Sequence, residues 1–188
     1  FLLHNNGDST FSEIGSSAGI AFGRGGDARG AMGIDVAWFR NDESIGIAIG
    51  NFASEMSALF VSKKGMYFTD EALANGLGAK TLLDLTFGVV WGDFDLDGRL
   101  DLFAANGHLE ENIHRIIDSQ HYAQPPQLFW NCGAEHATEF EPLAEEQCGA
   151  DFFQPMVGRG AVLADFDNDG DLDVVIVGSG QAARFLRN

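Results

Sequence analysis

Short runs of apolar residues alternate with glycine-rich and acidic turns along most of the chain. Runs of this length and composition predict β-strands rather than helices. The clearest are Val89–Phe94 with Leu100–Ala105, and Ala161–Phe166 with Leu172–Val177, and in each pair an Asp-Gly loop joins the two runs. Each pair therefore predicts a β-hairpin.

Two further strands are predicted after such hairpins, which makes the repeating unit a four-stranded meander. Short apolar runs that end in a polar residue give the third strands, at Leu2–Asn5, Leu59–Ser62, Leu128–Asn131 and Phe185–Asn188. Phe-centred runs give the fourth strands, at Thr10–Glu13, Tyr67–Asp70 and Glu139–Glu141. Tandem four-stranded units are typical of β-propeller blades, so the predicted fold class is all-β.

The repeat divides the chain into units of one propeller segment that spans residues 1–188. The expected units are a half blade at 1–14, full blades at 31–72 and 87–143, and an incomplete blade at 157–188. So few blades do not close a ring, because propellers have about four to eight. We therefore expect the segment to belong to a larger ring, completed by the rest of a longer protein or by further copies.

An excursion at 107–126 interrupts the third unit. Leu109, Ile113, Ile116 and Ile117 recur at spacings of three to four, which predicts a short amphipathic helix before Pro125–Pro126. The excursion has two open interpretations: a loop that carries binding function, or a helix that caps the core.

The two hairpin loops share one nine-residue pattern with Asp at positions 1, 3, 5 and 9, and Gly at position 6. Calcium prefers six to eight oxygen ligands, which alternating carboxylates in a tight loop can supply. The predicted ligands in the first loop are Asp93, Asp95, Asp97, the carbonyl of Arg99, and Asp101. Those in the second are Asp165, Asp167, Asp169, the carbonyl of Asp171, and Asp173. We therefore predict two Ca²⁺ sites.

Two other interpretations of these loops are weaker. An EF-hand needs Glu at position 12 between two helices, whereas Ala104 and Ile176 stand there between apolar strands. A metal-free acidic turn explains one loop, but it does not explain why the same pattern occurs twice.

A third copy of the hairpin, with strands at 33–39 and 45–49, has lost the acidic pattern. Its loop has Trp38, Arg40, Asp42 and Gly46 at positions 1, 3, 5 and 9. We expect no calcium there, and Arg40 is a candidate to fill the space with its own charge.

Composition limits the classes of partner. The formal net charge is −17, from 28 acidic and 11 basic residues, and nine of the 17 Asp lie in the two loops. Nucleic acids and anionic membranes require a basic surface, so neither is an expected partner. No apolar stretch approaches the ~20 residues that span a bilayer. The chain begins with Phe1 and has no signal peptide, so it reads as processed or cut from something longer.

Cys132 and Cys148 lie sixteen positions apart, in a stretch without helix or strand periodicity. We favour a disulfide, which implies an oxidising compartment; two unlinked thiols are the alternative.

These motifs resemble FG-GAP repeats of integrin α-subunit propellers. They are more similar still to the VCBS-type repeats of the ASPIC/UnbV and cartilage acidic protein family. The matching motifs are Phe87–Gly88, D-F-D-L-D-G-R-L-D-L-F, A-N-G-H at 105–108, V-G-R-G-A at 157–161, D-F-D-N-D-G-D-L-D-V and N-N-G-D-S-T-F at 5–11. The resemblance implies a secreted or cell-surface propeller with calcium in some blades, and roles in adhesion and matrix association.

The expected function is therefore that of an extracellular, calcium-stabilised binding, adhesion or structural module with a protein or glycan ligand. One alternative is a propeller-based hydrolase or lyase acting on glycans or lipids, with His108, Glu110 or Glu111 as acid and base. Another is a subunit of a surface filament or larger complex.

Overall fold

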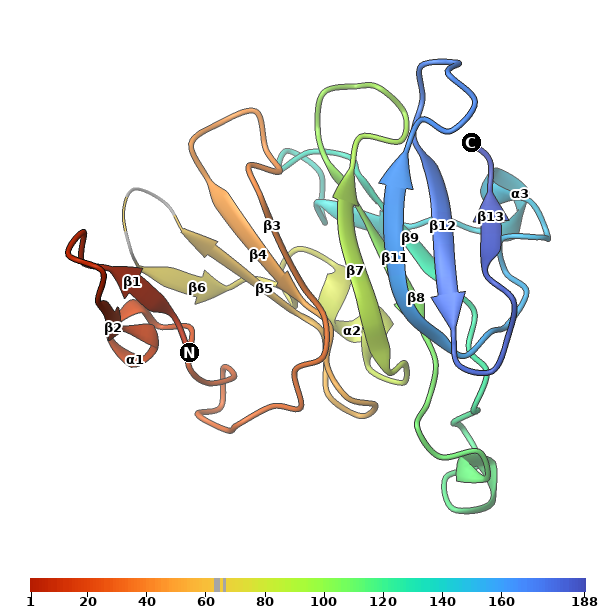
Figure 1. Ribbon diagram of the computed structural model, residues 1–188, viewed down its shortest axis with the longest axis horizontal. Helices are drawn as coiled ribbons and strands as arrows, with labels where there is room; N and C mark the ends of the chain where they lie inside the picture. Colours follow the sequence, from red (N-terminus) through yellow and green to blue (C-terminus); the bar gives the residue numbers. More distant parts are fainter. Residues whose placement is uncertain (63–64, 66) are drawn as a thin grey trace.

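The computed structural model describes residues 1–62, 65 and 67–188, and this part of the chain folds into four antiparallel β-sheets (Figure 1). Residues 63, 64 and 66, within the predicted 31–72 unit, lie outside the described residues. The strands are β1 (Leu3–Asn5), β2 (Phe11–Glu13), β3 (Ile34–Ala37), β4 (Ile45–Ile49), β5 (Ala58–Ser62), β6 (Phe68–Asp70), β7 (Thr86–Gly92), β8 (Asp101–Asn106), β9 (Gln127–Asn131), β10 (Phe140–Pro142), β11 (Gly158–Ala164), β12 (Asp173–Gly178) and β13 (Arg184–Leu186).

Every sheet is a meander in which each strand pairs with its neighbour in sequence. The sheets are β1-β2, β3-β4-β5-β6, β7-β8-β9-β10 and β11-β12-β13, and all their pairings are antiparallel. The prediction of an all-β fold is confirmed at this level. The three predicted hairpins correspond to β3-β4, β7-β8 and β11-β12.

The first strands of three sheets lie side by side, with β7 in contact with both β3 and β11 (Figure 1). Glycine makes this close approach feasible at two points. A Cβ atom at Gly33 would lie 1.9 Å from the carbonyl oxygen of Phe87, and one at Gly88 would lie 2.8 Å from the backbone nitrogen of Ala161. Neither position can hold a larger residue unless the neighbouring sheets separate.

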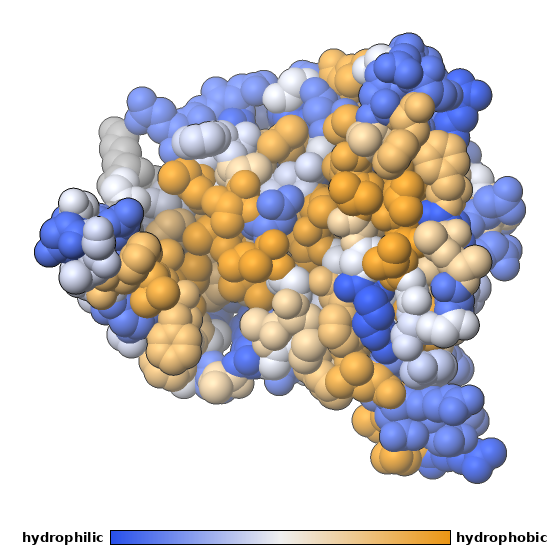
Figure 2. Space-filling model, viewed as in Figure 1, coloured by the Kyte–Doolittle hydropathy of each residue, from blue (hydrophilic) through white to orange (hydrophobic). Residues whose placement is uncertain are grey.

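The core fills the spaces between adjacent sheets. Between the second and third sheets, the ring of Phe39 stacks on Trp91 and Phe140, with centroids 5.2 and 5.9 Å apart. Between the third and fourth sheets, Phe103 and Ile176 are fully buried. Other apolar side chains stay exposed, including Ile34 of β3 and Val162 of β11, and hydrophobic surface spreads across the middle of Figure 2.

Helical structure is sparse. The helical elements are α1 (Gly15–Ala18), α2 (Leu77–Thr81), α3 (Glu145–Cys148) and the 3-10 turn η1 (Ile113–Arg115). Among the described residues, no helix is long and apolar enough to cross a membrane.

The prediction of an amphipathic helix in the 107–126 excursion is wrong. Only the three-residue turn η1 forms, and of the four apolar residues in the pattern Ile113 alone is buried. The excursion is closed at its base instead, by a bridge between Gly107 and Ala123 and a hydrogen bond from the His108 amide to the Tyr122 carbonyl, 2.8 Å. A compact loop of this kind satisfies its backbone without a continuous helix.

Candidate metal centres

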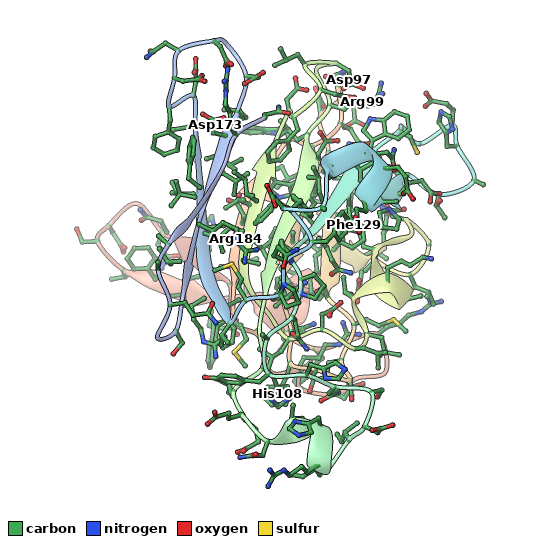
Figure 3. All side chains as sticks on the ribbon, turned by 90° about the vertical axis from the view of Figure 1, so that its right-hand side faces the viewer. Asp97, Arg99, His108, Phe129, Asp173 and Arg184 are labelled. Carbon is green, nitrogen blue, oxygen red and sulfur yellow. The ribbon has the colours of Figure 1, made fainter. Side chains whose placement is uncertain are left out.

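The two acidic loops join β7 to β8 and β11 to β12, and both lie at the same edge of the sheets. Figure 3 places Asp97 and Arg99 of the first loop and Asp173 at the end of the second near this edge, whereas His108 lies at the opposite end. In each loop the side chains at positions 1, 3 and 5 converge, with one ligand atom from each within 4.8 Å of the others. The two triads are Asp93, Asp95 and Asp97, and Asp165, Asp167 and Asp169.

The backbone of the two loops is the same in detail. The carboxylate of Asp93 accepts the amide hydrogens of Asp97 and Gly98, at 3.0 and 2.9 Å. Asp165 accepts the amides four and five positions on in the same way, both at 3.1 Å. This wrapping of the chain around the first carboxylate holds the other two on the same side of the turn.

Both loops also require the same unusual backbone angles. Gly98 and Gly170 have φ of 87° and 105°, and Leu96 and Asn168 have φ of 60° and 61°. Positive φ is unstrained for glycine and costs energy for leucine. The sequence pattern therefore specifies one loop conformation twice.

Position 9 has a different role in this structure from positions 1, 3 and 5. Asp101 and Asp173 are 3% and 0% exposed and begin strands β8 and β12. Asp101 accepts the amide hydrogens of Phe94 and Asn131, at 3.1 and 2.8 Å. Asp173 likewise accepts two backbone amides, one from its own loop and one from the chain after β13. Burial raises the pKa of Asp101 to about 6. These carboxylates close the base of each loop.

Position 7 was predicted to offer a backbone carbonyl. In the first loop, the Arg99 side chain contacts Asp97, and its Nε donates to the carbonyl of Asn131 at 2.8 Å. In the second, the Oδ1 atom of Asp171 is buried and has no hydrogen-bond partner within the described part of the chain. A buried oxygen without a partner is costly unless a cation or water satisfies it.

Two residues that the sequence pattern did not single out complete the surroundings: Trp130 of β9 and Arg187, which directly follows β13. The indole Nε1 of Trp130 donates to Asp95 at 2.8 Å. The guanidinium of Arg187 pairs with Asp167 at 2.6 Å and Asp169 at 2.9 Å. Arg187 lowers the pKa of Asp169 to about 2. The signal available in the sequence was that each residue directly precedes an Asn in a repeated third-strand motif.

The third hairpin loop, at 38–44, has no such carboxylate triad among its described residues. Arg40 points across to the next sheet, where it forms a two-point ion pair with Glu139, both contacts being 2.6 Å, and approaches Glu71 at 3.3 Å. The hydrogen bonds that Arg40 donates to Glu139 raise the pKa of Arg40. The charge of Arg40 therefore joins two sheets.

The expected disulfide is not formed. Cys132 and Cys148 are free thiols. Cys132 is buried, and its Sγ lies 3.1 Å from the carbonyl of Thr138, whereas Cys148 lies in α3 and packs against the core between the third and fourth sheets. The two residues therefore belong to different surroundings, and the inference of an oxidising compartment loses this support.

The residues of the alternative catalytic group at the excursion do not converge on one another, and the ring of His108 packs edge-on against Phe52. His108 is 3% exposed, and its Nδ1 accepts the amide hydrogen of Glu110 at 2.9 Å. Burial lowers the pKa of His108. Glu110 and Glu111 are both exposed. The Nε2 atom of His108 is buried without a hydrogen-bond partner in the described part of the chain, so the hydrogen bond at Nδ1 fixes the start of the excursion.

The residues of both loops fit a hard divalent cation. The donor set consists of carboxylate oxygens, which such cations prefer, and three carboxylates so close together repel one another unless a positive charge lies between them. The fold and loops thus define an all-β protein with two acidic loops that could hold a metal ion.

The chain is a distant homologue of cartilage acidic protein 1 from Homo sapiens and from Mus musculus. It is 29% identical to each over 180 residues, which cover 94% of this chain and 24% of the relative. The chain thus spans about a quarter of the length of these relatives. No family model matches the chain.

Proposed function

We propose that the chain is a calcium-stabilised segment of a β-propeller with FG-GAP or VCBS-type repeats. It serves as a binding, adhesion or structural module outside the cell. The observation that carries the proposal is the pair of acidic loops, which repeat the same carboxylate triad and the same positive-φ positions. Calcium accepts six to eight oxygen ligands in flexible geometry, and it is abundant outside cells.

The arrangement of the sheets supports the propeller part of this proposal. Propeller blades are four-stranded meanders whose first strands gather around a central axis. Here β3, β7 and β11, each the first strand of its sheet, lie side by side and approach through equivalent glycines at Gly33 and Gly88. The homology to cartilage acidic protein 1 and the formal charge of −17 support an extracellular setting with a protein or glycan ligand.

In this proposal calcium has a structural role. Asp93, Asp95 and Asp97 in one loop, and Asp165, Asp167 and Asp169 in the other, would hold the ion, and its charge would offset their repulsion. A ligand that binds only the folded state stabilises it by about 1.4 kcal/mol at ten times its Kd.

The experiment is thermal melting with millimolar calcium and again with excess chelator. We expect calcium to raise the melting temperature of the parent chain by several degrees, and we expect Asp95→Ala/Asp167→Ala to abolish the rise. The matched control is Asp118→Ala/Asp151→Ala, which removes two exposed carboxylates outside the loops and should keep the full rise. A parent chain that melts at the same temperature in both buffers would refute the proposal.

A further inference from the structure

The two acidic loops are approached by equivalent residues of different charge. Trp130 and Arg187 each precede an Asn whose backbone N–H donates to the carboxylate at position 9. Asn131 donates to Asp101 at 2.8 Å, and Asn188 donates to Asp173 at 3.0 Å. The third strands therefore meet the two loops in the same register. The side chain one residue earlier reaches the acidic triad in both cases.

At the first loop this side chain is neutral. Trp130 donates a single hydrogen bond to Asp95, through its indole nitrogen. The loop does have an arginine of its own, but Arg99 contacts only Asp97, and its Nε is held by the carbonyl of Asn131.

At the second loop the equivalent side chain is a cation that spans two members of the triad. The Nε of Arg187 lies 2.6 Å from Asp167, and a terminal nitrogen lies 2.9 Å from Asp169. The guanidinium therefore uses two of the three carboxylates that a metal ion would need. Both groups cannot bind the same oxygens at full strength, because each draws on the same negative charge.

The Arg187 side chain is 62% exposed, so it can move into water when a competing ion arrives. Exposed ion pairs are weak, because water screens both charges and holding the side chains in place costs entropy. A competitor of this strength shifts calcium affinity without blocking the loop.

We propose that Arg187 is an intramolecular counter-cation that competes with calcium for Asp167 and Asp169. It raises the calcium concentration at which the 165–173 loop fills. The inference rests on the proposed function, since it requires that this loop binds calcium. It adds that calcium binding releases the guanidinium from the loop.

The test measures calcium binding to the second loop alone, by titration calorimetry with calcium chloride. Asp93→Ala/Asp95→Ala serves as the background, because it removes two ligands of the first loop. In this background we expect Arg187→Leu to lower the Kd for calcium about three- to tenfold, which corresponds to the loss of two weak ion-pair contacts.

The matched control is Arg184→Leu in the same background. Arg184 begins strand β13, which ends one residue before Arg187. It carries the same charge and donates to the carbonyl of Gln154 instead of to the loop. It should change the Kd less than twofold, which separates direct competition from the general loss of a positive charge.

A reciprocal variant tests the same idea at the first loop. In an Asp165→Ala/Asp167→Ala background, Trp130→Arg should weaken calcium binding to the 93–101 loop by a similar factor.

The outcomes distinguish this inference from the proposal beneath it. Equal calcium affinity for the background and its Arg187→Leu variant overturns the competition and leaves calcium binding intact. An equal gain from Arg184→Leu also overturns it, since that gain would come from net charge. Absence of binding in both proteins at 10 mM calcium, a concentration on the order of extracellular levels or above, removes the proposed function at this loop and the inference with it.

Discussion

The loops at 38–44 and 93–101 join equivalent strands of neighbouring sheets, yet they handle charge in opposite ways. Arg40 lies where the second of these loops has Asp95. The positive charge of its side chain pairs with Glu139, which is 3% exposed and directly precedes strand β10 of the next sheet. The 93–101 loop instead gathers three carboxylates that lie at the surface and could share a dissociable cation.

The comparison extends to position 9 of the pattern. Asp101 is buried there and accepts two backbone amides. In the third hairpin this position is Gly46 of strand β4, and the ring of Phe39 fills the space beside it. A Cβ atom at Gly46 would lie 2.4 Å from that ring. Phe39 can then stack on Trp91 and Phe140.

The difference teaches that one hairpin frame can be stabilised in two ways. Aromatic packing and an internal ion pair fix the 38–44 loop to its neighbour under all ionic conditions. In the proposed function, an acidic loop is stabilised by a cation that the solvent supplies. A chain with both kinds has an internal ion pair that connects two sheets and two carboxylate triads that could hold a metal ion.

The largest expected effect comes from breaking the internal ion pair. Arg40→Ala would leave Glu139 buried without its main partner, and a broken buried pair of this kind costs about 3 kcal/mol or more. We expect this loss in the free energy of unfolding, measured by urea denaturation. The loss should be the same in calcium and in chelator, because the 38–44 loop has no carboxylate triad in the described structure.

Arg40→Met/Glu139→Gln is the control for this prediction. It removes both charges and keeps side chains of similar length, so it should recover much of the stability that Arg40→Ala loses. A loss below about 1 kcal/mol for Arg40→Ala would mean that the pair behaves like an exposed one.

A smaller effect is expected from filling the space at Gly46. In Gly46→Ala, the new methyl group meets the fully buried ring of Phe39, and overpacking of this kind costs about 2 kcal/mol. Gly160→Ala is the matched control, because a Cβ atom in strand β11 would meet only Val177, at 3.3 Å. Urea denaturation of both variants measures the difference, and equal losses would show that the Phe39 ring yields readily.

Local features of this fold were open to prediction from sequence. The hairpins and their loops depend on alternating apolar runs and on Asp and Gly at fixed offsets, and all of these interactions lie within about ten residues. The positive φ of Gly98 is an example, since position 6 of the pattern demands a sharp turn. The strand positions at β7 and β8 followed from the same short-range signal.

Contacts between distant parts of the chain were not open to prediction. Arg40 meets Glu139, which lies 99 residues away, and nothing near either residue indicates the pairing. The spacing of apolar residues also predicted a helix in the excursion that does not form. Leu109 and Ile116 match a helical period but are exposed and have no surface to pack on. The two cysteines mislead for a related reason, because their separation along the chain does not show that Cys132 follows β9 whereas Cys148 ends α3 against another part of the core.

The smallest expected effect concerns Asp84, a carboxyl in the turn before β7 whose charge the fold disfavours. Burial raises its pKa to about 6, against 3.8 when unperturbed. The folded state therefore holds the proton more tightly than the unfolded state, and the stabilisation is fully present below about pH 4 and is lost as the pH rises through 6. Asp84→Asn should thus be more stable than the parent by about 1 kcal/mol at pH 7.5 and equal to it at pH 3.5. The value at pH 7.5 is smaller than the full pKa shift would give, because the side chain is only half-buried and water screens its charge. Urea denaturation of both proteins in chelator gives the difference in their free energies of unfolding at each pH. The acidic loops titrate equally in both proteins, so their contribution cancels in this difference. A difference that does not change with pH would mean that Asp84 ionises in the folded chain as readily as in water. The Arg40–Glu139 pair would then be the buried charge that matters for stability in this comparison.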